Sequence, residues 1–163
     1  PIPFRAKVTL EVREPTAPYA VSFPTPGELQ TPRGIMNPAL SPDGNTLVFG
    51  AADHLWRQPI DGGPVERLVE GRGHEREPVL SPDGKQLLFI SSEAWKDRVR
   101  LLDLDTRETQ TLAEGLLYWD LAWSHDGRRV VFGGVEPSAP RPRFIVVDLY
   151  DGTTERLGPP GSG

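Results

Sequence analysis

The chain contains 163 residues, of which 37% are hydrophobic, and its formal net charge is −5. Its length allows one domain with a buried core, and its lack of cysteine excludes disulfides, thiolate nucleophiles and cysteine-bound metal ions. The basic residues are scattered and no apolar run reaches the roughly 20 residues of a membrane span, so the sequence predicts neither a nucleic-acid partner nor a membrane-spanning helix.

Residues 1–36 are expected to form an extended segment. Apolar and polar side chains alternate over 6–13, which is typical of a half-buried strand, and a second strand is expected over 19–23. Prolines interrupt the rest and favour extended connections over regular structure. The segment is therefore predicted to be a linker or to complete a neighbouring sheet.

A four-residue turn motif then recurs three times. Ser-Pro-Asp-Gly stands at 41–44 and 81–84, and Ser-His-Asp-Gly stands at 124–127. Proline presets the backbone of the second turn position, aspartate accepts hydrogen bonds from nearby N–H groups, and glycine tolerates a positive φ. The sequence therefore predicts structural turn roles for Asp43, Gly44, Asp83, Gly84, Asp126 and Gly127.

Each turn belongs to a unit of four short strands. The first strand ends at the turn serine, and in the first unit the others are expected at 46–49, 55–57 and near 67–68, with the same order after the other two turns. A repeat of about 40 residues built from short strands is typical of β-propeller blades. The predicted fold class is all-β, a partial β-propeller with three visible blades of four antiparallel strands.

The predicted blades differ in the length of one connection. They occupy 37–76, 77–119 and 120–158, and residues 159–163 are a tail or an added linker. The connection between the second and third strands is short after Phe49, longer after Phe89 and longest after Phe132. Because repeat proteins often bind through connections on one face, we expect the binding face there.

The repeated pattern also resembles a known family. Residues 37–157 carry, with variations, Pro-x-Leu/Trp-Ser-Pro-Asp-Gly-x-x-Leu-Val/Leu-Phe, which resembles the WD40-like repeat of TolB-type β-propellers. Such propellers occur in periplasmic TolB, in tricorn-like proteases, in prolyl-oligopeptidase relatives and attached to bacterial amidohydrolases. The resemblance implies a periplasmic or other extracytoplasmic location. Residues 3–8 and the prolines after them further resemble the propeller of a periplasmic amidohydrolase-type protein, so the parent protein could be a hydrolase.

The sequence predicts no catalytic, metal-binding or cofactor-binding residue. His74-Glu75-Arg76-Glu77 begins like a zinc-protease helix but lacks the second histidine four residues on. His54 opens a strand and His125 stands in a tight turn, so both are expected to be structural or solvated. The repeated serines do not stand in a Gly-x-Ser-x-Gly elbow, which makes a nucleophile improbable.

Three polar residues occupy equivalent positions four residues before the turn serines. Asn37, Glu77 and Asp120 stand where the chain enters the innermost strand of each predicted blade, at the rim of a central channel. Such a rim could bind a cationic peptide, an N-terminus or a metal ion, or it could be a hydrated channel mouth. Trp95 and Tyr118 are expected to add aromatic contact area near the same face.

Three blades leave two blade faces without a neighbour. If each face exposes roughly 400 Å² of apolar surface, the lost burial is about 10 kcal/mol per face. That loss is comparable with the stability of a whole domain, about 5–15 kcal/mol. The sequence therefore predicts either a homodimer, in which two copies supply six blades, or association with missing blades.

Two functions from different classes fit these features. The first is a TolB-like propeller module without intrinsic catalysis, which binds or scaffolds a protein or peptide partner. The alternative is the accessory propeller of an extracytoplasmic amidohydrolase or peptidase, which gates or scaffolds a separate catalytic domain. The chain could also be a natural or engineered fragment of a longer propeller.

Overall fold

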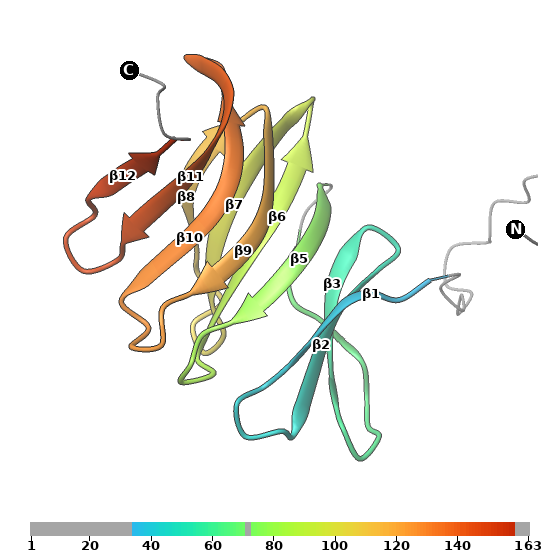
Figure 1. The fold of residues 1–163 in the computed structure, drawn as a ribbon. Helices are drawn as coiled ribbons and strands as arrows, with labels where there is room; N and C mark the ends of the chain where they lie inside the picture. Colours follow the sequence, from blue (N-terminus) through green and yellow to red (C-terminus); the bar gives the residue numbers. More distant parts are fainter. Residues whose placement is uncertain (1–33, 71–72, 159–163) are drawn as a thin grey trace, which may run out of the picture. The chain divides into compact units, whose positions relative to one another are not determined.

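The computed structural model describes residues 34–70 and 73–158, whose strands form three four-stranded antiparallel sheets (Figure 1). The first sheet contains β1 (Met36–Leu40), β2 (Thr46–Ala51), β3 (His54–Pro59) and β4 (Glu66–Arg67). The second contains β5 (His74–Leu80), β6 (Gln86–Glu93), β7 (Lys96–Asp103) and β8 (Thr109–Gly115). The third contains β9 (Leu117–Trp123), β10 (Arg129–Glu136), β11 (Ala139–Asp148) and β12 (Thr154–Leu157).

Each sheet is a meander, because its strands are hydrogen-bonded in chain order. The described residues contain no helix, and therefore none long and apolar enough to cross a membrane. This architecture confirms the predicted all-β fold class and the four-stranded units. β5 and β9 begin at His74 and Leu117, a few residues before the blade limits that the sequence suggested. The strands expected at 6–13 and 19–23, and the tail at 159–163, lie outside the described residues.

The three repeated turns join the first and second strands of each sheet in the same way. In the first turn, the Ser41 hydroxyl donates a hydrogen bond to Asp43 Oδ1 at 2.5 Å and accepts one from the Thr46 N–H at 2.8 Å. Gly44 has a φ of +74°, in the left-handed region that favours glycine. The other two turns repeat the serine–aspartate bond at 2.6 Å, and their glycines have φ values of +72° and +69°. The repeated polar side chains are thus engaged within the turns.

The middle sheet is covered on both faces. Leu87 and Phe89 of β6 pack in an apolar cluster with residues of the first sheet. The alternate residues Leu88 and Ile90 pack in a second cluster with residues of the third sheet. All four side chains are fully buried. Because neighbouring residues of a strand point to opposite faces, an unbroken apolar run such as this one is typical of a strand that is buried on both sides.

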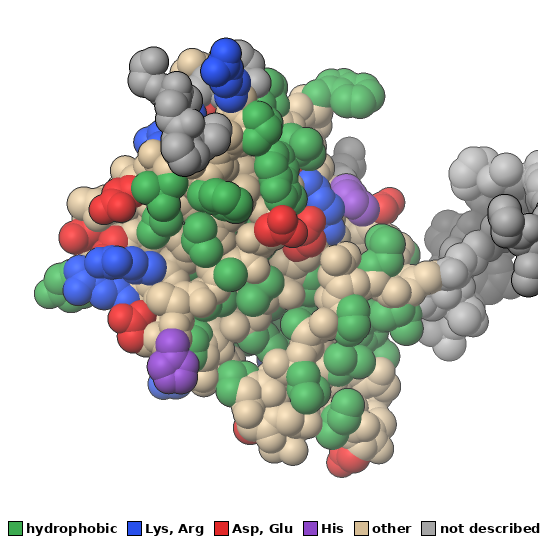
Figure 2. Space-filling model, viewed as in Figure 1, with side chains coloured by type: hydrophobic (Ala, Val, Ile, Leu, Met, Phe, Trp, Pro, Cys, Tyr) green, Lys and Arg blue, Asp and Glu red, His purple; other side chains and the backbone are tan. Residues whose placement is uncertain are grey.

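The third sheet has an apolar face that remains exposed. Phe144 and its cross-strand partner Leu157 are 58% and 52% exposed. In the first sheet, Leu40 of β1 is 55% exposed on the face away from the second sheet, but Phe49 of β2 on the same face is only 6% exposed. Figure 2 shows hydrophobic side chains gathered over the third sheet and over β1 and β2. In the second sheet, the place of Phe144 is taken by Val99, which is fully buried against the third sheet. The exposed face of the third sheet therefore corresponds to a covered face of the second.

Buried carboxylates on strands link neighbouring sheets. Glu75 of β5 accepts a hydrogen bond at Oε2 from the Leu55 N–H of β3, with a distance of 3.1 Å. Asp97 of β7 accepts one at Oδ2 from the Tyr118 N–H of β9, at 2.8 Å. Burial raises the pKa of Glu75 above its ordinary value, although the Leu55 N–H partly offsets this effect. Each sheet is thus joined to the next by a polar contact as well as by apolar packing.

Candidate functional site

The innermost strand of each sheet carries a β-bulge at the same place. The pairing register shifts between Met36 and Ala39 in β1, between Arg76 and Val79 in β5, and opposite the equivalent part of β9. The residues with left-handed backbone at these irregularities have φ values of 49°, 53° and 55°; they are Asn37, Glu77 and Asp120. A bulge reorients a side chain, and bulges are frequent beside functional sites. We refer to these three residues as the inner-strand row.

The structure links two members of the inner-strand row directly. Glu77 Oε2 accepts a hydrogen bond from the Asp120 N–H at 2.9 Å, which connects β5 to β9. Asn37 and Asp120 are exposed, and Glu77 is half-buried. The row therefore presents one amide and two carboxylates, a set of acceptors suited to ammonium and guanidinium groups. In the described part of the chain, no group of three or more acidic or histidine side chains is arranged to hold a metal ion.

The two aromatic candidates differ completely in their exposure. Trp95 stands at the tip of the β6–β7 hairpin and is 97% exposed. Tyr118 is fully buried, so the expectation that it adds aromatic contact area is wrong. Its ring meets the Phe132 ring edge-on, with centroids 5.3 Å apart, and burial raises its pKa to about 12. Gly115 makes room for it, since a Cβ there would lie 2.6 Å from the Tyr118 hydroxyl.

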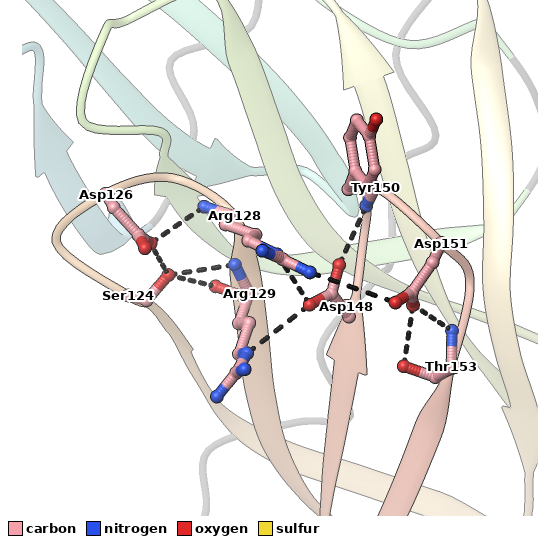
Figure 3. Close-up of polar contacts among 8 residues, drawn as sticks. All are labelled: Ser124, Asp126, Arg128, Arg129, Asp148, Tyr150, Asp151 and Thr153. Carbon is pink, nitrogen blue, oxygen red and sulfur yellow. Dashed lines mark hydrogen bonds and ion pairs between the residues drawn. The ribbon is translucent and has the colours of Figure 1, made fainter.

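The acidic side chains of the turns in the third sheet are bound within the fold (Figure 3). Asp126 Oδ1 accepts a hydrogen bond from the Ser124 hydroxyl at 2.6 Å, and this bond holds the pKa of Asp126 below its ordinary value. Asp148 Oδ2 lies 2.7 Å from Arg128 Nε and 3.4 Å from Arg129 Nε. Both carboxylates stabilise turns of the third sheet, and Asp148 also pairs with two arginines of that sheet.

The histidines of the described residues lie at strand ends and in a turn. His54 Nδ1 lies 2.9 Å from Arg67 Nη2, and His74 Nδ1 lies 2.8 Å from Asp53 Oδ1, both near the junction of the first and second sheets. His125 stands in the third turn and is exposed. Local hydrogen bonds therefore explain the positions of His54 and His74 without a bound ligand.

A cleft between the first and second sheets was not predicted from the sequence. The cleft consists of two adjoining hollows of about 370 and 330 Å³, both of which are lined by Arg100 and Glu70. The signal in the sequence is a charged residue within the apolar strand Val99-Arg100-Leu101-Leu102. Its meaning depends on the pairing between strands and the packing between sheets, which the repeat pattern alone does not reveal.

Comparison with solved structures identifies the fold. The chain is similar to TolB from Acinetobacter baumannii, with a TM-score of 0.68 and 24% identity over 79% of this chain and 33% of that one. It is also similar to the β-propeller domain of the Trilobed protease from Pyrococcus furiosus, with a TM-score of 0.65 and 18% identity over 78% of this chain and 43% of that one.

Curated proteins match in sequence over parts of their length. The Tol-Pal system protein TolB of Francisella tularensis is 30% identical over 84 residues, which are 48% of this chain and 19% of that protein. Tricorn protease homolog 1 of Streptomyces coelicolor is 24% identical over 159 residues, which are 92% of this chain and 13% of that protein. The chain thus spans less than a fifth of the length of these two relatives, and no family model matches it.

These findings define the class of protein. Three successive four-stranded meanders, packed face to face and similar to solved propellers, are blades of a β-propeller. The fold is that of TolB-like propellers, and the described residues form three blades.

Proposed function

We propose that this TolB-like propeller segment is a binding or scaffold module that recognises a protein or peptide partner through the inner-strand row. The observation that carries the proposal is the recurrence of a left-handed bulge residue with a polar side chain, Asn37, Glu77 or Asp120, on every inner strand. Left-handed backbone at residues other than glycine costs free energy and is concentrated at functional sites. Two carboxylates in the row favour a cationic group on the partner, such as a lysine side chain or an N-terminus.

The other repeated polar residues form hydrogen bonds within their turns, which supports the same proposal. The serine and aspartate of every repeated turn bond to each other, so their recurrence has a structural explanation. The inner-strand row has a different pattern, because its residues differ in type and two of its side chains are exposed. A propeller also supports binding more often through its rims and loops than through its buried faces.

The alternative is an accessory propeller of an extracytoplasmic peptidase or amidohydrolase. It is supported by the similarity to a tricorn protease homologue and to the propeller of the Trilobed protease. In that case the blades gate or scaffold a catalytic domain elsewhere in the protein, and these residues carry no catalysis themselves. Either function is compatible with the extracytoplasmic, periplasmic location that we infer from the resemblance to TolB.

The exposed apolar face of the third sheet bears on the partners expected for both proposed functions. We propose that this face is covered in the working protein, by a second copy of the chain or by further blades. This proposal rests on the equivalence between the exposed Phe144 and the buried Val99.

Titration calorimetry with a cationic peptide tests the binding proposal. The probe is the capped peptide Lys-Ala-Lys-Ala-Lys, and the variant is Glu77→Gln with Asp120→Asn, which removes both charges and keeps oxygen acceptors. We expect the affinity of the double variant to fall about fivefold to thirtyfold, because each of the two exposed ion pairs contributes about 0.5–1 kcal/mol.

The matched control removes the same two charges elsewhere. Asp61 and Glu155 are exposed and outside the row, so Asp61→Asn with Glu155→Gln should keep the affinity of the original chain. Equal affinity of the two double variants would refute the assignment of the row as the binding site.

A further inference from the structure

A polar cleft lies between the first and second sheets. One hollow is lined by residues that include Glu75, Ser91 and Thr111, and the other by residues that include Glu66 and Arg107. Arg100 of β7 and Glu70 line both, so the two hollows adjoin along the sheet junction. Their volumes of about 370 and 330 Å³ are in the lower range of ligand pockets.

Arg100 occupies a position that is apolar in the other two sheets. It pairs with Phe89 across β6 and β7, and the corresponding pairs are Phe49 with Trp56 and Phe132 with Ile145. Directly opposed residues of neighbouring strands point to the same face, so Arg100 faces the first sheet together with Phe89. Arginine at this position replaces an apolar side chain with a charged group that loses part of its solvation.

The guanidinium of Arg100 also lacks the partners that its neighbours have. Within residues 34–70 and 73–158, its Nε is buried and has no hydrogen-bond partner, and its Cζ lies 5.8 Å from the centroid of the Phe89 ring. By contrast, Arg98 pairs with Glu114 at 2.8 Å, and Arg107 pairs with Glu66. A buried guanidinium N–H without an acceptor is costly, and a carboxylate is the acceptor that best matches its planar geometry.

We propose that the cleft binds a peptide carboxylate on Arg100, either a C-terminus or an acidic side chain. Three glutamates, Glu70, Glu75 and Glu93, line the same hollow and outnumber its two arginines, Arg98 and Arg100. A dianion such as phosphate is therefore repelled more strongly than a single carboxylate carried by a neutral or cationic chain. The buried hydroxyl of Ser91 and the exposed hydroxyl of Thr111 supply hydrogen bonds to peptide groups beside that carboxylate. Two hollows on either side of Arg100 suit an extended ligand better than a small acid.

This site is separate from the inner-strand row and does not depend on it. The row presents acceptors to cationic groups, whereas the cleft presents a donor to an anionic one. Loss of binding at one should therefore leave the other unchanged.

Peptides that differ in one carboxylate test the proposal on the full chain. The probes are Ala-Ala-Ala, its C-terminal amide, and the doubly capped peptide Ala-Glu-Ala, each titrated by NMR with inorganic phosphate as a fourth probe. We expect Ala-Ala-Ala or capped Ala-Glu-Ala to bind at least about tenfold more tightly than the amide, because a charge-assisted hydrogen bond is lost in the amide. Whichever of the two binds identifies the source of the carboxylate.

Variants of Arg100 connect the preference to this residue. Arg100→Met should abolish the preference for the carboxylate while the fold stays intact by circular dichroism, since apolar side chains stand at this position in the other sheets. Arg100→Lys, which keeps the charge but loses the planar fork, should retain only part of it. Arg141→Met is the matched control, because Arg141 is an exposed arginine on β11 outside the cleft.

Four results would overturn the proposal: equal affinity for Ala-Ala-Ala, its amide and capped Ala-Glu-Ala; binding that survives Arg100→Met; tighter binding of phosphate; or no binding of either carboxylate peptide up to its solubility limit.

Discussion

Asp97 shows at the scale of single residues how neighbouring blades are held together. Its side chain accepts hydrogen bonds from Arg76 at 2.6 Å, from the Ser92 hydroxyl at 2.6 Å and from the Tyr118 N–H at 2.8 Å. Burial acts to raise the pKa of Asp97, but the hydrogen bonds from Arg76, Ser92 and Tyr118 outweigh it and hold the pKa below the ordinary value of 3.8. The ionised form therefore stabilises the fold.

Replacement of Asp97 should destabilise the chain in a pH-dependent way. Because the pKa is depressed in the folded state, the stabilisation is present above the unfolded pKa and is lost as the pH falls through the folded pKa. We expect Asp97→Asn to lower the free energy of unfolding by about 2–3 kcal/mol at pH 7, since it leaves the Arg76 charge uncompensated. The difference from the original chain should shrink below about pH 4.

Urea denaturation at pH 7 and at pH 3 measures this difference. Asp105→Asn, in an exposed turn of the same sheet, is the control and should have little effect at either pH. A loss of the same size at both pH values for Asp97→Asn would contradict the assigned role of the ionised carboxylate.

At the scale of elements, the β6–β7 hairpin contains a costly turn. Its two central residues, Ala94 and Trp95, have φ values of 50° and 65°, as a type I′ turn requires. Alanine and tryptophan are unfavourable in this conformation, whereas Asn-Gly is favoured. Replacing Ala94-Trp95 by Asn-Gly should therefore raise the free energy of unfolding by about 1–2 kcal/mol in chemical denaturation.

The control for this change is Trp95→Ala, which removes the exposed ring but keeps a side chain in the left-handed conformation. It should gain much less stability than the Asn-Gly variant. Equal stability of the two variants would show that the turn conformation is not the source of the cost.

The sequence predicted the elements where their chemistry is local. Proline, aspartate and glycine at fixed places specify the repeated turns, and strict repetition specifies four strands per unit. The sequence located the inner-strand row, because its three residues occupy the same position before each repeated turn. It did not indicate the left-handed backbone at Glu77, since glutamate has no special preference for that conformation.

The errors concern residues whose environment is set by packing between sheets. Tyr118 is buried because Gly115 and the third sheet leave space for its ring, and neither is evident from the residues beside it. The cleft around Arg100 exists only because the first sheet packs against the second, so the position of one arginine in an apolar strand was the single available signal.

At the scale of the whole molecule, equivalent faces of the sheets are unequally covered. The middle sheet buries both of its faces, whereas the third sheet leaves an apolar face exposed among the described residues, around Phe144 and Leu157. At about 25 cal/mol per Å² of apolar surface, faces of this kind favour association strongly. We therefore expect the chain on its own to self-associate. The smallest closed assembly is a dimer, in which two copies supply six blades.

Size-exclusion chromatography with light scattering tests this central claim most directly. We expect a particle of about twice the chain mass of 18.0 kDa. Phe144→Glu should weaken the association, because it places a charge on the exposed apolar face. A stable, well-folded monomer of 18.0 kDa that does not bind a dye for exposed apolar surface would contradict it.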